Sequence, residues 1–167
     1  MFRASLLQKA LKGADSMRWL ARQWPVLLWA ALIWILSTHW FTAGNTSRII
    51  FPILRFLFPH ASRAFLIHAH GFIRKCGHVT VYFVFSLLLL RAIRNGRPGF
   101  TITWALAVIL IVFAYACVDE LHQSFVPGRG VEFSDVLLDT AAGTFAQILA
   151  GLWIAGREKR ISERHRG

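Results

Sequence analysis

Long runs of apolar residues, separated by short polar stretches, dominate the hydropathy pattern of this chain. No Asp, Glu, Lys, Arg or His occurs between Phe100 and Val118. At about 1.5 Å per residue, a helix of that length crosses roughly the hydrocarbon core of a bilayer. Similar runs predict membrane-spanning helices over residues 25–41, 72–90 and 132–154. The pattern therefore predicts an all-α polytopic membrane protein, a bundle of four transmembrane helices.

The connection between the first two predicted spans is too long for a turn and too apolar for open water. Its stretches 49–58 and 62–72 are amphipathic and are interrupted by Pro52 and Pro59. We predict helices that lie in the outer membrane interface or re-enter the bilayer. The chain then divides into a basic amphipathic N-terminal segment (1–24), a transmembrane domain (25–155) and a basic cytoplasmic tail (156–167).

Composition supports a membrane protein and changes the meaning of the charge. Hydrophobic residues make up 56% of the chain, and the formal net charge is +11. On a soluble protein such a charge would indicate nucleic-acid binding. Here the basic residues flank apolar spans, which indicates membrane topology and contact with lipid headgroups, with no nucleic-acid partner.

The distribution of Lys and Arg predicts the orientation of the spans. Most basic residues fall before the first span, between the second and third spans, or after the fourth. With four spans these segments lie on one side, which the positive-inside rule assigns to the cytoplasm. We therefore predict a multi-pass protein of the cell (inner) membrane with both termini cytoplasmic.

Scarce acidic residues gather in one segment, DELHQSFVPGRGVEFSD (119–135). The segment joins the outer ends of the third and fourth spans, opposite the start of the second. Helical spacing places ionisable side chains on one face of each of these helix ends. These faces are expected to meet in one outward-facing polar pocket, contributed by Lys75, His78 and Tyr82, by Asp119 and His122, and by Asp135 and Asp139.

The side chains of this pocket suggest acid–base chemistry on an anionic group. His122 is the best candidate for a general acid or base because carboxylates flank it. Lys75 and Arg129 suit a phosphate or carboxylate, although Arg129 can equally fix its loop by pairing with Asp119 or Asp135. The predicted catalytic residues are His122, Asp119, Glu120 and His78, and the predicted substrate-binding residues are Lys75, Tyr82, Gln123, Arg129, Asp135 and Asp139.

Three alternatives stay open. The whole cluster can be a buried polar network that only fastens three helices, and His78 can be an ordinary core histidine. A metal site is not favoured, because no standard ligand spacing occurs and Lys and Arg lie nearby, so no metal or cofactor is predicted. Cys76 and Cys117, at the outer ends of adjacent spans, either form a disulfide or, as we favour, only pack.

Two blocks, RKCGHVTVY (74–82) and DELHQSFVPGRGVEFSDVLLDTAAG (119–143), resemble the VanZ-like family, named after a teicoplanin-resistance protein. The resemblance departs at Val81, where members often carry Glu, and at Asp139, where they often carry Asn. Val81 removes a carboxylate, and Asp139 restores one from the opposite helix. The family pattern is matched by Lys75, His78, Tyr82, Asp119, Glu120, His122, Gln123, Pro127, Gly128, Arg129 and Asp135.

The resemblance implies a small multi-span protein of the cell envelope without a settled reaction. One hypothesis is a hydrolase or transferase acting on a lipid-linked or phosphorylated envelope substrate. The alternative is a non-catalytic protein that binds a lipid or a glycopeptide antibiotic and confers resistance. A transporter is less favoured, because four spans are few. Expected partners are membrane lipids and a lipid-linked envelope precursor or a glycopeptide, and the oligomeric state stays open.

Overall fold

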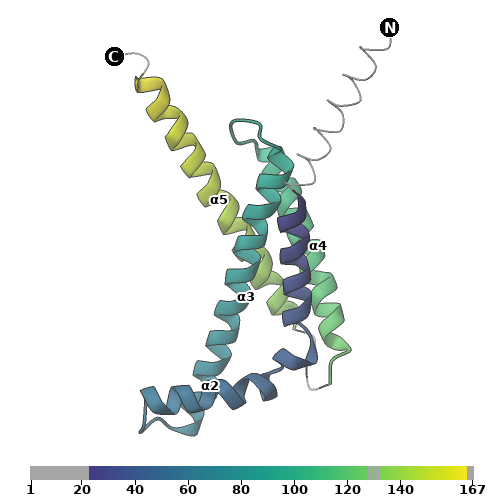
Figure 1. The fold of residues 1–167 in the computed structure, drawn as a ribbon, viewed down its shortest axis with the longest axis vertical. Coiled ribbons are helices and arrows are strands. Elements are labelled where there is room, and N and C mark those ends of the chain that lie inside the picture. Colours follow the sequence, from purple (N-terminus) through teal and green to yellow (C-terminus); the bar gives the residue numbers. More distant parts are fainter. Residues whose placement is uncertain (1–22, 128, 130–131, 165–167) are drawn as a thin grey trace, which may run out of the picture.

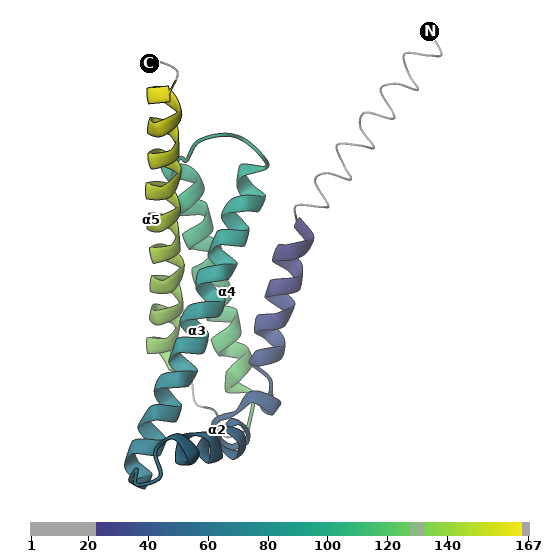
Figure 2. The same cartoon turned by 60° about the vertical axis from the view of Figure 1, so that its left-hand side comes forward.

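A computed structural model describes residues 23–127, 129 and 132–164, and every regular element in these ranges is helical. The predicted N-terminal segment, up to residue 22, lies outside the described residues. The first helix and three long helices run along the long axis, and α2 lies across one end of them (Figures 1 and 2). In chain order the elements are Gln23–Leu36, the 3₁₀ turn η1 (His39–Phe41), α2 (Ala43–Leu57), α3 (Arg63–Arg94), α4 (Ile102–Ser124) and α5 (Phe133–Arg164).

The helices α3, α4 and α5 are each long and apolar enough to cross a membrane. The first helix meets the same test only together with η1 and α2, as a pair bent by 64°. The described part of the chain thus has three membrane-crossing helices, or four where the bent pair counts as one span. The predicted all-α polytopic fold is confirmed.

The first predicted span, residues 25–41, is wrong at its C-terminal end. The helix stops at Leu36, and its described part, Gln23–Leu36, is about 21 Å long at about 1.5 Å per residue. The hydroxyls of Ser37 and Thr38 donate to the carbonyls of Ile33 and Ile35, at 3.0 and 2.7 Å. Such back-bonding competes with the main-chain donors that would continue the helix.

The connection between the first two spans also differs in detail from the prediction. Pro52 lies inside α2 instead of breaking it. Proline has no N–H to donate to the carbonyl four residues earlier, which belongs to Arg48, and Arg48 is exposed. Residues 62–72 are not a separate helix but the beginning of α3, where Ser62 Oγ accepts a hydrogen bond from the Phe65 N–H at 3.2 Å. Pro59 does fall in a break, between α2 and α3.

The last two helices are longer than the predicted spans. The helix α4 continues past Val118 to Ser124, so Asp119, Glu120 and Gln123 are helical residues. The helix α5 continues past Ile154 to Arg164, so most of the predicted tail is helical. The polar residues of the segment 119–124 are therefore held at fixed angles around α4, not in a flexible loop.

Small and polar residues bring the long helices close together. A Cβ atom at Gly143 of α5 would lie 2.8 Å from Cγ1 of Val112 on α4, so the Val112 side chain packs directly on the Gly143 backbone. Across the other face of α5, Ser86 Oγ donates to the Gly143 carbonyl at 2.8 Å and accepts from Gln147 Nε2 at 2.7 Å. Close packing and interhelical hydrogen bonds are the forces that hold helices together in lipid.

This packing gives a test of the α4–α5 contact. The substitution Gly143→Ala should cost about 1–3 kcal/mol, because the new methyl group overlaps Val112. The double substitution Gly143→Ala with Val112→Ala should recover part of that loss. Thermal unfolding in detergent measures both, with Gly156→Ala as the control, since nothing lies within 4 Å of a Cβ there. Equal effects of Gly143→Ala and Gly156→Ala would contradict the packing.

Candidate functional site

A cavity of about 160 Å³ lies between the first helix, α2, α3 and α4. It is near the end of the bundle that α2 crosses (Figure 2). The first helix, the beginning of α2, and the neighbouring parts of α3 and α4 surround it. Its wall combines apolar side chains with a group of charged and hydroxyl-bearing ones. The polar lining residues are Ser37, Thr46, Arg74, His78, Tyr82, Asp119 and Arg129.

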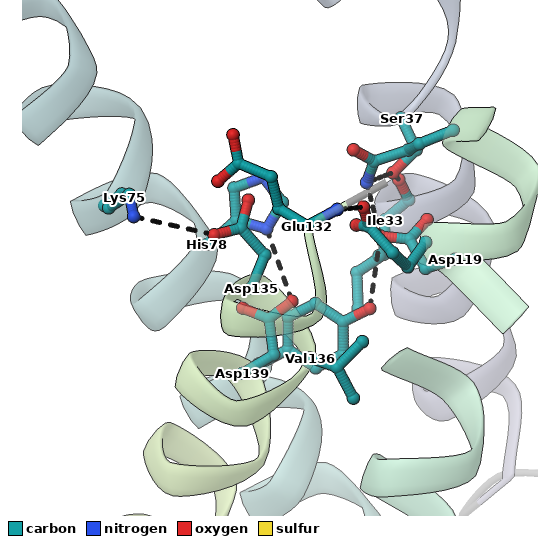
Figure 3. A network of polar contacts seen from close by, with 12 residues as sticks. Ile33, Ser37, Lys75, His78, Asp119, Glu132, Asp135, Val136 and Asp139 are labelled. Carbon is teal, nitrogen blue, oxygen red and sulfur yellow. Dashed lines mark hydrogen bonds and ion pairs between the residues drawn. The ribbon is translucent and has the colours of Figure 1, made fainter. Parts of the chain in front are cut away.

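An ion pair between α3 and α5 forms one edge of the site (Figure 3). His78 Nδ1 and Asp139 Oδ2 lie 3.3 Å apart, and the two side chains are 20% and 5% exposed. The second oxygen of Asp139 is buried and has no hydrogen-bond partner among the described residues. Since Asp139 occupies Nδ1, it fixes the orientation of the ring and leaves Nε2 as the other polar atom of His78.

A buried carboxylate faces the cavity from α4. Tyr82, which is fully buried, donates to Asp119 Oδ2 at 3.2 Å, and Gln123 Nε2 donates to the same oxygen at 3.0 Å. Gln123 Nε2 also lies 3.4 Å from Ser37 Oγ on the first helix. The other oxygen, Asp119 Oδ1, is buried without a partner among the described residues. The network orients one carboxylate oxygen and leaves the second available.

Two arginines bring positive charge to the cavity. Arg129 donates from Nη1 to the Ser37 carbonyl and from Nη2 to the Phe41 carbonyl, each at 2.9 Å. Arg74 donates from Nη1 to the Phe41 carbonyl at 3.1 Å. Burial, followed by the charge of Arg74, lowers the pKa of Arg129, but an arginine stays protonated in proteins. Main-chain carbonyls, and not Asp119 or Asp135, therefore hold the Arg129 side chain.

Six predicted site residues are not part of the cavity wall: Lys75, Glu120, His122, Gln123, Asp135 and Asp139. The Lys75 side chain is 56% exposed and pairs with Asp135, with Nζ 3.7 Å from Oδ1. Glu120 Oε1 accepts a hydrogen bond from the Glu132 N–H and so ties the end of α4 to the beginning of α5. Lys75, Asp135 and Glu120 thus join helix ends around the cavity without lining it.

His122 also lies away from the cavity. Its ring stacks on Trp34, with centroids 3.9 Å apart and planes 9° apart, and it lines a neighbouring cleft beside Thr38 and Phe125. Its Nδ1 is buried and has no partner among the described residues. The expectation that His122 and Asp119 act in one pocket is not met by their positions. Gln123, one residue further along α4, takes the place beside Asp119.

Arg74 is a charged cavity residue that the sequence prediction does not include. Its spacing to His78 and Tyr82 is i, i+4, i+8, which is as good a one-face pattern as the spacing from Lys75. His70 is also absent from the predicted site, yet it is buried, and its Nε2 lies 2.9 Å from Thr46 Oγ1. That hydrogen bond ties α2 to α3 beside the cavity.

Among the described residues, the thiols and carboxylates are not grouped as a disulfide or a metal site would require. Cys76 and Cys117 are both free thiols. In the parts of the chain that the structure describes, no three His, Cys, Asp or Glu side chains group as metal ligands would. The acidic side chains instead pair with His78 and Lys75 or accept hydrogen bonds from Tyr82 and Gln123.

A double-mutant cycle tests whether the His78–Asp139 pair is a strong contact. We expect a coupling energy of about 1–3 kcal/mol between His78→Asn and Asp139→Asn, because the pair is largely buried. The matched cycle of Lys75→Gln and Asp135→Asn should give less than about 1 kcal/mol, because Lys75 is exposed. Unfolding in mixed detergent micelles measures both cycles. Coupling no larger for the first pair than for the second would contradict the geometry.

Comparison with known proteins agrees with the sequence resemblance. The model of the VanZ/LLP1 family matches residues 24–154, which cover the first helix, the candidate site and most of α5. No curated protein and no solved structure matches the chain. The match covers well over half of the sequence and includes every predicted site residue. This chain is therefore a member of the VanZ/LLP1 family.

Proposed function

We propose that this protein is a cell-envelope enzyme that cleaves or transfers a phosphoester group of a lipid-linked substrate. The proposal rests on the set of charged side chains that surround one cavity at the end of the helix bundle. Two arginines, a histidine oriented by Asp139, and the unpartnered oxygen of Asp119 line it or lie at its edge. Ionisable residues in membrane helices more often serve function than packing.

The proposed orientation places the cavity at the outer face of the inner membrane. The α3–α4 turn and the C-terminal end of α5 lie at the end of the bundle opposite α2 (Figure 2). Basic residues gather at that opposite end, which the positive-inside rule assigns to the cytoplasm. They include Arg91, Arg94, Arg97, Arg157, Lys159, Arg160 and Arg164.

The arginines suit the recognition of an anionic headgroup. The carbonyls of Ser37 and of Phe41 in η1 hold Arg129 and Arg74 in place, so little side-chain freedom is lost when an anion binds. Arg129 Nε is buried and has no partner among the described residues, which leaves a donor for a phosphate oxygen. The apolar lining residues Ile33, Leu36 and Val81 suit the first carbons of a lipid chain.

The His78–Asp139 pair and Asp119 supply the proton transfers of hydrolysis. In this scheme Asp119 Oδ1 accepts a proton from water as the water oxygen bonds to phosphorus. The bond between phosphorus and the leaving oxygen breaks, and His78 Nε2 donates a proton to that oxygen. Tyr82 and Gln123 hold Asp119, and Asp139 stabilises the protonated imidazole. An alcohol in place of water would give transfer instead of hydrolysis.

Phosphate release from a defined lipid tests the reaction. Purified protein in liposomes containing a polyprenyl diphosphate should release inorganic phosphate. His78→Asn and Asp119→Asn should each slow release by about 10²–10⁴-fold, the usual contribution of a general acid or base. The control His68→Asn, at an exposed α3 position away from the cavity, should be unaffected. Equal activity of His78→Asn and the wild type would remove His78 from the mechanism.

Binding separates the enzyme from the non-catalytic alternative. Arg129→Gln should raise KM for the same lipid about tenfold or more with a smaller change in kcat, because it removes a charge-assisted contact. Retention of the diphosphate lipid without any phosphate release would identify a non-catalytic lipid-binding protein instead. Neither binding nor release by the wild-type protein would overturn the proposal for this class of substrate.

A further inference from the structure

A second hollow lies at the far end of α3 and α5, remote from the cavity. The two helices diverge there (Figure 1), and a groove of about 430 Å³ lies between them. From His78 to Arg94, α3 rises about 24 Å at 1.5 Å per residue. The mouth of the groove therefore reaches the membrane surface opposite the one that holds the cavity.

The body of the groove is apolar. Leu90 and Ile154 line it and are only 4% and 7% exposed, so they form its floor. Leu149 and Trp153 also line it and are 41% and 62% exposed, so they form a more open wall on α5. In a membrane such a hollow, running between two helices, is filled by an acyl chain.

The mouth of the groove is basic. Arg91 and Arg94, spaced i, i+3 on one face of α3, both line it. Arg94 Nη2 donates to the Arg97 carbonyl at 3.1 Å, whereas Arg94 Nε is buried and has no partner among the described residues. A bound phosphate oxygen would satisfy that donor, which otherwise costs free energy to bury.

An aromatic–cation contact marks the depth of the mouth. The Arg157 guanidinium lies over the Trp153 ring, 4.9 Å from its centroid. Tryptophan favours the headgroup level of a bilayer, where its ring is half in water. No acidic residue lines the groove among the described residues, and Glu158 lies beside Gly99 in the α3–α4 turn. The charge at this depth is therefore complementary to a phosphate.

We propose that this groove binds one anionic phospholipid of the adjacent leaflet. Its phosphate contacts Arg91 and Arg94, and one acyl chain lies on Leu90 and Ile154. The apolar floor and the cationic mouth together select an anionic lipid over a zwitterionic one. The site is separate from the cavity of the proposed reaction and does not depend on that reaction.

Native mass spectrometry of the full chain tests the site. Dioleoyl phosphatidylglycerol should remain bound as a single lipid and bind more tightly than dioleoyl phosphatidylcholine. The double substitution Arg91→Gln with Arg94→Gln should weaken phosphatidylglycerol binding about tenfold or more and abolish the preference, as expected from losing charge-assisted contacts. The control Arg160→Gln with Arg164→Gln removes equal charge from α5 outside the groove and should have no such effect.

A groove-filling variant provides an independent arm. Ala150→Phe should exclude the lipid without changing charge, because Ala150 lines the groove. Size-exclusion chromatography and tryptophan fluorescence show that each variant is folded. Equal weakening by the control pair would show diffuse electrostatic attraction, and retention of the lipid by folded Ala150→Phe would place it elsewhere. Competition by inorganic phosphate would indicate a simple anion site. Each of these three results would overturn the proposal.

Discussion

The polar seam between α3 and α5 determines where the side chains of the candidate site lie. It consists of the His78–Asp139 pair and the hydrogen bonds that Ser86 makes with the Gly143 carbonyl and with Gln147. On α3 the two residues of the seam are eight positions apart, and on α5 its three residues are four positions apart. Buried polar groups in an apolar medium are costly unless paired, so all these contacts must form in one register. A shift of one helical turn, about 5.4 Å, would break every one of them.

Much of this arrangement follows from the sequence. Uncharged runs long enough to cross a bilayer predict α4 and the central parts of α3 and α5, and the antiparallel order brings their polar ends together. The departure at Val81 was informative, because Asp139 on the facing helix does place a carboxylate on His78. The first helix was less predictable. Its end depends on Ser37 and on Arg129, which is remote in sequence and holds the Ser37 carbonyl.

The sequence predicts the polar face of each helix better than it predicts which side of that face meets the cavity. Lys75 is a predicted pocket residue, but its neighbour Arg74 lines the cavity. His122 and Gln123 are both predicted site residues, and it is Gln123 that lies beside Asp119. A step of three residues turns a helix by about 300° and a step of four by about 400°, so both neighbours lie near one face but on opposite flanks. Which flank meets the cavity depends on the rotation of the helix, and that is set by packing against distant residues such as Val112 and Gly143.

The helices α3 and α5 pack closely next to the cavity and diverge at their far ends. The reason is that lipid solvates an apolar helix face but not a polar one. An apolar face left open by diverging helices is solvated by acyl chains almost as well as by another helix, so parting costs little there. A polar face has no such substitute and must stay paired. Polar residues therefore determine where α3 and α5 meet, next to the cavity, and beyond Gln147 mainly apolar side chains such as Leu87 and Leu149 line the space between them. The groove at the far end is the expected consequence of a seam that does not extend the full length of the two helices.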